Sequence, residues 1–277
     1  MLSLEHVYTA CSFFFCFYRE AGIMKGNIND SCMKQGCLTY TDEKGGLIML
    51  ELKLKSGEVK QCEAGAYVHE LLEAWNVKEA VYAVTLDGKL HDLNYRIKKS
   101  GALDYIYADS ETGKLIYERS LNFLFIVAVR SLFPDARVRM EHALSGGQYC
   151  EIDKEGYCKP QDVRKIEKRM KELIAANEVI HRRVVATAEA QAYFDRLGMK
   201  NKANLLACRK SATSSIYTLC GYDDYFYGIM LPDTSYLTHF SIRFYAPGVW
   251  LSAGNGFQNQ AKLFHVFQEF ETWGRLI

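Results

Sequence analysis

The residue types that most often carry catalysis are scattered along this sequence instead of being grouped. The seven histidines stand singly, and no two of them have the spacing of metal ligands on one helix or loop. No GxxxxGK(S/T) phosphate-binding loop and no GxGxxG, GxSxG or HExxH motif occurs. Gly113 and Lys114 are followed by Leu115, which has no hydroxyl group for magnesium. The sequence therefore predicts no catalytic and no cofactor-binding residue.

Two pairs of cysteines share one spacing and are the only candidate for a zinc site built from thiolates. These are Cys11 with Cys16 and Cys32 with Cys37. A gap of four residues between ligands is at the loose end of the range for zinc, and no histidine supports the set. We interpret them as free cysteines, with a zinc site as the alternative.

The composition is that of a soluble globular protein with room for two domains. Of the 277 residues 49% are hydrophobic and 24% are charged, which argues against disorder. The formal net charge of +1 gives no general attraction to DNA or to an acidic membrane. The apolar run at residues 10–18 is too short to span a bilayer and lacks a basic segment before it. With nine cysteines, an odd number, these features predict a cytoplasmic protein with reduced thiols and no membrane partner.

The first half of the chain predicts an irregular extension and then a small mixed sheet packed on one helix. Residues 1–47 have no sustained periodicity and contain several residues typical of turns, namely Gly26, Asn27, Asn29, Asp30, Gly36, Gly45 and Gly46. From Ile48 apolar residues alternate with polar ones, as in a half-buried strand, and Ser56-Gly57 can turn the chain into a hairpin. The further elements expected in this domain, residues 48–110, are a return strand at 58–62, a helix at 66–75 and strands at 81–85 and 103–108.

The second half predicts a helical core followed by aromatic strands. A helix over 118–133 is apolar nearly all round and should be central to a core, ending before Pro134. Pro160 opens a second helix, and a third is expected over 186–197. From about Ala203 the chain is rich in tyrosine and phenylalanine, and we favour a sheet core there over a platform for stacked bases.

The second of these helices has a basic outer face. Its cations are interleaved with Glu167 and Glu172, so a solvated face is favoured over an RNA-binding ridge, which stays open as the alternative. The cations are Arg164, Lys165, Lys168, Arg169 and Lys171.

The order of these elements resembles the front part of threonyl-tRNA synthetases. Residues 48–108 resemble the TGS domain, a small β-grasp module, and residues 118 to about 250 resemble the second additional domain, which edits mischarged tRNA. The resemblance implies an α+β fold in which a β-grasp domain precedes an editing-like α+β domain at 118–255. It rests on SLNFLFIVAVRSLFP (120–134), GQYCEI (147–152), DVRKIEKRMKEL (162–173), AEAQAYFDRLG (188–198) and YFYGIMLP (225–232).

The ligands of the editing domain are missing at the positions that match them. The family's first metal motif is HxxxH on the long helix, and Arg119 and Phe123 stand at those positions. Its second motif is CxxxH before a proline, and Phe226 and Met230 stand there. A cation and three apolar side chains cannot coordinate zinc, so the resemblance implies a degenerate editing site with no metal.

The same pair of domains also resembles the N-terminal half of bacterial uridine or nucleoside kinases. The resemblance is closest in GYDDYFYGIMLPDTSYL, residues 221–237, and in KLFHVFQEFETWGRLI, residues 262–277. In that family a P-loop kinase domain comes next, so ATP and magnesium would belong to that domain and not to this chain. Residues 256–277 are then expected to be a helical exit segment toward that kinase domain, which would be the chain's own partner.

Three functions follow from these resemblances. The first is a non-catalytic regulatory or substrate-sensing module of a nucleoside kinase. In such a module, the place of the former editing metal site is either filled with core side chains, which we favour, or is a nucleoside pocket. The pocket would be formed by Asn122, Tyr222, Asp224 and Tyr225. The second is an RNA-associated or tRNA-associated binding module. The third is a tRNA-editing deacylase, which the lost ligands argue against.

Overall fold

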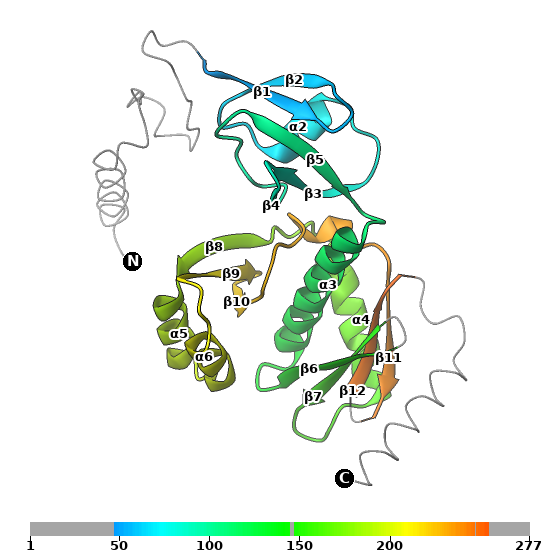
Figure 1. Cartoon of the computed structure of the whole chain (residues 1–277). Coiled ribbons are helices and arrows are strands. Elements are labelled where there is room, and N and C mark those ends of the chain that lie inside the picture. Colours follow the sequence, from blue (N-terminus) through cyan, green and yellow to red (C-terminus); the bar gives the residue numbers. More distant parts are fainter. Residues whose placement is uncertain (1–46, 145–146, 247, 255–277) are drawn as a thin grey trace, which may run out of the picture. The chain divides into compact units, whose positions relative to one another are not determined.

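The computed structural model describes residues 47–144, 147–246 and 248–254. Residues 1–46 of the predicted extension, both cysteine pairs and the predicted exit segment lie outside the described residues. The chain divides into two compact units (Figure 1). Of the described residues, the first takes in 47–77, Leu86–Lys89 and Asn94–Asp104; the second takes in Lys78–Thr85, Leu90–Leu93 and those from Tyr105 onward.

A five-stranded mixed sheet with one helix follows the predicted order for the first domain. Its strands lie in the order β2-β1-β5-β3-β4, with β1 antiparallel to β2 and parallel to β5. In β1 the leucines are buried and the residues between them are exposed, which confirms the predicted alternation. This arrangement is a β-grasp fold, and its elements are β1 (Met49–Leu54), β2 (Val59–Glu63), α2 (Val68–Ala74), β3 (Val81–Leu86), β4 (Lys89–His91) and β5 (Gly101–Tyr107).

Helix α3 (Glu111–Leu132) is the central element of the second unit and is buried on nearly all sides. It ends before Pro134 as predicted, but it begins at Glu111 and not at residue 118. Ser110 caps it, because its hydroxyl accepts a hydrogen bond from the Gly113 N–H at 3.0 Å. A glycine is needed at position 113, because a Cβ there would lie 2.1 Å from the Tyr107 carbonyl oxygen.

A four-stranded antiparallel sheet packs beside α3 and α4 (Figure 1). Its order is β11-β12-β7-β6, so β12, the last strand of the described chain, pairs with β7, which precedes α4. Trp250 of β12 is 1% exposed and is among the largest buried side chains. The elements are β6 (Arg137–Leu144), β7 (Gly147–Asp153), α4 (Pro160–Ala175), β11 (Phe240–Tyr245) and β12 (Gly248–Ala253).

A second, three-stranded sheet with two short helices completes this unit. The strands β8 (His181–Ala186), β9 (Thr213–Leu219) and β10 (Tyr222–Tyr225) lie in the order β10-β9-β8. Phe194 of α5 (Thr187–Arg196) and Leu206 of α6 (Lys200–Ala207) share a small core with Ile216 of β9. A 3-10 turn, η2 (Thr234–Tyr236), follows β10.

The sequence analysis missed β8 and α6, and it began the β-rich region too early, at Ala203. Strand β8 is almost fully exposed, so its sequence has no apolar alternation to reveal it. Helix α6 has eight residues and only two buried side chains, too few for a clear helical period. No helix within the described ranges is long and apolar enough to cross a membrane.

Candidate functional site

The four positions that match the editing motifs come together beside α3. Arg119 and Phe123 lie one turn apart on α3, and the segment that leaves β10 brings Phe226 back to this face. The ring centroids of Phe123 and Phe226 are 5.4 Å apart with an interplanar angle of 59°. The Arg119 guanidinium donates a hydrogen bond to the carbonyl oxygen of Ile229, which precedes Met230.

Hydrogen bonds from α3 and β9 hold the segment that follows β10. The Ser120 hydroxyl accepts the N–H of Leu231 at 2.9 Å and donates to the Ile116 carbonyl oxygen at 2.8 Å. The Tyr217 hydroxyl donates to the Gly228 carbonyl oxygen at 2.6 Å. Gly228 has a φ of +95°, and a Cβ there would meet the Arg119 guanidinium carbon at 2.8 Å. The segment therefore requires a glycine for Arg119 to lie against its backbone.

The side chains at these positions do not fit a metal ion. Phe123 is fully buried and Met230 is 1% exposed, while Phe226 packs against the same core. Zinc in proteins takes imidazole, thiolate or carboxylate ligands, whereas a guanidinium carries a fixed positive charge and a phenyl ring has no donor atom. No group of three His, Cys, Asp or Glu side chains in the described part of the chain could hold a metal ion.

A buried carboxylate, that of Asp224, links three elements of this unit. Asp224 of β10 is fully buried, and one of its oxygens forms an ion pair with Lys202 of α6. Its other oxygen, Oδ2, lies 4.0 Å from a guanidinium nitrogen of Arg130 on α3 and accepts no hydrogen bond. Burial lowers the pKa of Lys202, and the negative charge of Asp224 opposes that effect. Asp224 therefore compensates two cations that tie α3, β10 and α6 together.

The residues predicted to form a nucleoside pocket engage different neighbours. The Asn122 amide donates to the Gln148 side chain of β7 at 2.7 Å, and Tyr222 packs against the main core. The Tyr225 hydroxyl accepts a hydrogen bond from Arg209 at 2.7 Å. Asp224 pairs with Lys202 as described, so each of the four has a partner of its own within the fold.

The sequence analysis did not single out Arg130, Lys202 or Arg209, which partner the residues of this site. Each is a basic residue on or next to a helix, and nothing in its spacing distinguishes it from a solvated lysine or arginine. Only the approach of α6 and α3 to β10 gives these three cations their roles.

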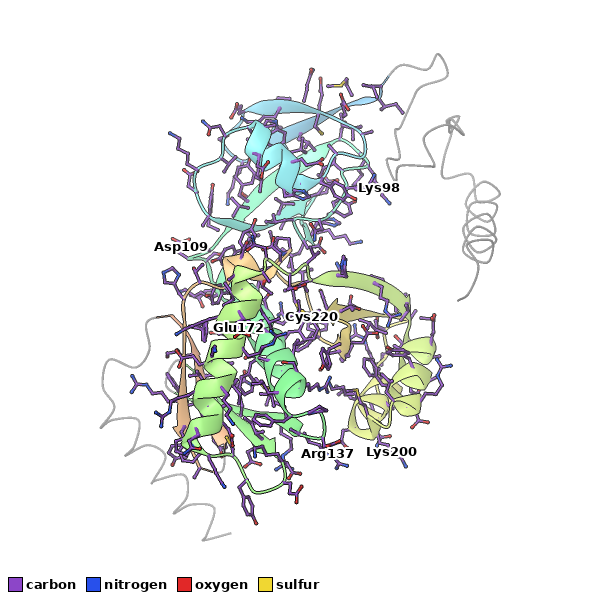
Figure 2. All side chains as sticks on the ribbon, turned by 180° about the vertical axis from the view of Figure 1, so that it is seen from behind. Lys98, Asp109, Arg137, Glu172, Lys200 and Cys220 are labelled. Carbon is purple, nitrogen blue, oxygen red and sulfur yellow. The ribbon has the colours of Figure 1, made fainter. Side chains whose placement is uncertain are left out.

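The basic outer face of α4 contains both paired and unpaired cations. Arg169 and Lys171 form ion pairs with Glu172 and Glu167, and Figure 2 marks Glu172 on this helix. The other three cations are exposed, and no carboxylate in the described ranges lies within ion-pair distance of them. They are Arg164, Lys165 and Lys168, at spacings that place them on one side of the helix.

Comparison with curated proteins finds threonine–tRNA ligases. The ligase of Pelobacter propionicus is 30% identical over 203 residues, 73% of this chain and 32% of the ligase. That of Burkholderia lata is 31% identical over 205 residues, again 73% of this chain and 32% of the ligase. That of Geobacter sp. strain M21 is 29% identical over 220 residues, 79% of this chain and 34% of the ligase.

This chain thus spans about a third of the length of the curated relatives it matches. No protein-family model matches it. The aligned region, which covers 73% of the chain, is homologous to part of threonine–tRNA ligases.

Proposed function

We propose that this chain is a non-hydrolytic, RNA-associated module that descends from the front part of a threonyl-tRNA synthetase. The observation that carries the proposal is a group of three α4 cations that form no ion pair with any described residue, within a region related to tRNA ligases. Arg164, Lys165 and Lys168 are exposed and form no ion pair within the described ranges, so they can contact phosphates. The positions that match the editing ligands have no atoms that could activate water.

RNA binding through such a face would be electrostatic and sensitive to salt. Each lysine or arginine that neutralises a phosphate releases a condensed counterion, which makes the logarithm of affinity fall linearly with the logarithm of salt concentration. With a formal net charge of +1, the chain has no global field, so the local α4 face would supply most of the attraction.

Gel shifts with tRNA over a salt series test this proposal. The variant carries Arg164→Gln, Lys165→Gln and Lys168→Gln, and its salt slope should fall by about two or more units if each contact contributes about 0.7–0.9. Lys171→Gln is the matched control, because Lys171 is already paired with Glu167. An absence of binding at low salt, or equal binding by the triple variant, would contradict the proposal.

The non-hydrolytic part of the proposal has a separate test. Elemental analysis of the purified chain should find no stoichiometric zinc, and mischarged tRNA should not be deacylated faster than in buffer. Stoichiometric zinc that remains after Cys11, Cys16, Cys32 and Cys37 are replaced by serine would overturn the matching of the four positions to the editing ligands, because the side chains at those positions cannot bind it.

A second candidate function is the front module of a nucleoside kinase. It is supported by the resemblance of residues 221–237, which include Asp224 and the segment packed on α3, to that family. ATP and magnesium would act in the kinase domain that the resemblance implies, and this chain would sense substrate. Calorimetry with uridine and with ATP tests the sensing role, and no heat at millimolar ligand would contradict it.

A further inference from the structure

Two arginines from different elements converge on the segment around Tyr227. The Arg209 guanidinium carbon lies 5.4 Å from the Tyr227 ring centroid and 5.8 Å from that of Tyr225. The Arg119 guanidinium reaches the same segment from α3, where it lies against Gly228 and donates to the Ile229 carbonyl oxygen. Arg209 therefore contacts the two tyrosine rings of residues 225–229, and Arg119 contacts the backbone that follows them.

Neither guanidinium forms an ion pair within the part of the chain that the structure describes. No Asp or Glu in the described ranges lies within ion-pair distance of Arg119 or Arg209, and the Arg209 Nε–H is buried without an acceptor. Burial lowers the pKa of Arg119, but a guanidinium remains protonated in proteins. A buried donor without a partner is unfavourable, and an anion would satisfy it. Planar guanidinium groups match phosphate oxygens especially well.

The Tyr227 ring is the second component of this arrangement. It is 74% exposed, although its neighbours Asp224 and Ile229 are buried. An exposed aromatic ring offers a stacking surface for a nucleobase, and base stacking on such rings contributes strongly to the binding of single strands. A stacked base and a nearby phosphate are the two parts of a nucleotide.

We infer that Tyr227, Arg119 and Arg209 form a nucleotide-binding site, with the base on the Tyr227 ring and the phosphate on the two guanidinium groups. The nucleotide is either free or the unpaired end of an RNA, since both present the same chemistry. This site does not depend on the α4 face, so it could exist whether or not tRNA binds there.

Calorimetry of the full chain with chemically matched ligands tests the inference. The ligands are uridine and adenosine 5′-monophosphate, their nucleosides, inorganic phosphate and a short single-stranded RNA. Binding of a monophosphate or of the RNA, at least tenfold tighter than that of nucleoside and of phosphate alone, supports the site. If both the monophosphate and the RNA bind, a free nucleotide is sufficient as the ligand. If the RNA alone binds, the ligand is the unpaired end of an RNA. No binding of either, or equal binding of inorganic phosphate, overturns the inference.

Exposed tyrosines supply variants that should fold normally. Tyr227→Ala should weaken binding about tenfold or more, while Tyr227→Phe, which keeps the ring, should change it little. Tyr157→Ala is the matched control, because Tyr157 is 78% exposed and the rings that Arg209 covers are those of Tyr225 and Tyr227. Arg209→Gln should remove the preference for monophosphate over nucleoside. Unchanged binding by Tyr227→Ala would overturn the site, and the triple variant of α4 should bind monophosphate normally.

Discussion

Truncating Phe123 should destabilise the second unit strongly if the former cleft is filled core. Its side chain is fully buried on α3, and its ring lies 5.4 Å from that of Phe226. Replacing a buried phenylalanine by alanine removes its transfer free energy and leaves a cavity, which together cost about 3–5 kcal/mol. We therefore expect Phe123→Ala to lower the free energy of unfolding by that amount.

The neighbouring ring allows the pair to be measured directly. Phe226 is only partly buried, so Phe226→Ala should cost less than Phe123→Ala. A double-mutant cycle should give a coupling of about 0.5–1.5 kcal/mol, the usual contribution of an aromatic pair beyond its buried area. Leu115→Ala is the control on the same helix, because Leu115 is 56% exposed and should change stability by about 0.5 kcal/mol or less.

Hydrogen exchange of peptides from α3, measured across a urea series, is the suitable assay. It reports on the opening of α3 itself, so unfolding elsewhere that leaves this helix intact does not contribute. If Phe123→Ala cost less than about 1 kcal/mol, the ring would border open space and the filled-core interpretation would be wrong.

Three further changes should each alter stability in a way that the structure specifies. Asp224→Ala should cost about 3 kcal/mol or more in urea unfolding, because it leaves two partly buried cations uncompensated; a cost near zero would mean that the pair is dispensable. Burial raises the pKa of Tyr217 to about 12, so its contribution to stability is complete below its ordinary value of 10.0 and is lost as the pH rises toward 12. Tyr217→Phe should therefore flatten the loss of stability over that range, and an unchanged alkaline profile would refute this. Ser110→Ala should cost about 1 kcal/mol by removing the cap of α3, measured by urea unfolding, whereas Ser110→Thr should cost less.

The strongest local patterns of the sequence were sufficient to predict several elements. The alternation in β1, the proline at the start of α4 and the apolar α3 each depend on side chains within a few residues of one another. Such patterns follow from the period of the element and need no partner. Two elements with weak hydrophobic periodicity were not predicted, because β8 is an exposed edge strand and α6 buries only two side chains.

For the candidate site, too, the sequence determined the residue types, and the fold determined which residues meet. The residue types at positions 119, 123, 226 and 230 determined by themselves that no zinc ligand stands there, because coordination chemistry depends on the side chain alone. Their convergence needed the fold, which places residues more than a hundred positions apart against one face of α3.

Only the tertiary structure determined which charged side chains beside the site are paired. Nothing local distinguishes Lys202, which compensates the buried Asp224, from Arg164, which stays unpaired on α4. Nor does the sequence show that Arg119 and Arg209 both reach the segment around Tyr227 and form no ion pair with any residue that the structure describes. The energy of a charge depends on its burial and on the nearest opposite charge, and both are set by elements that are distant in sequence.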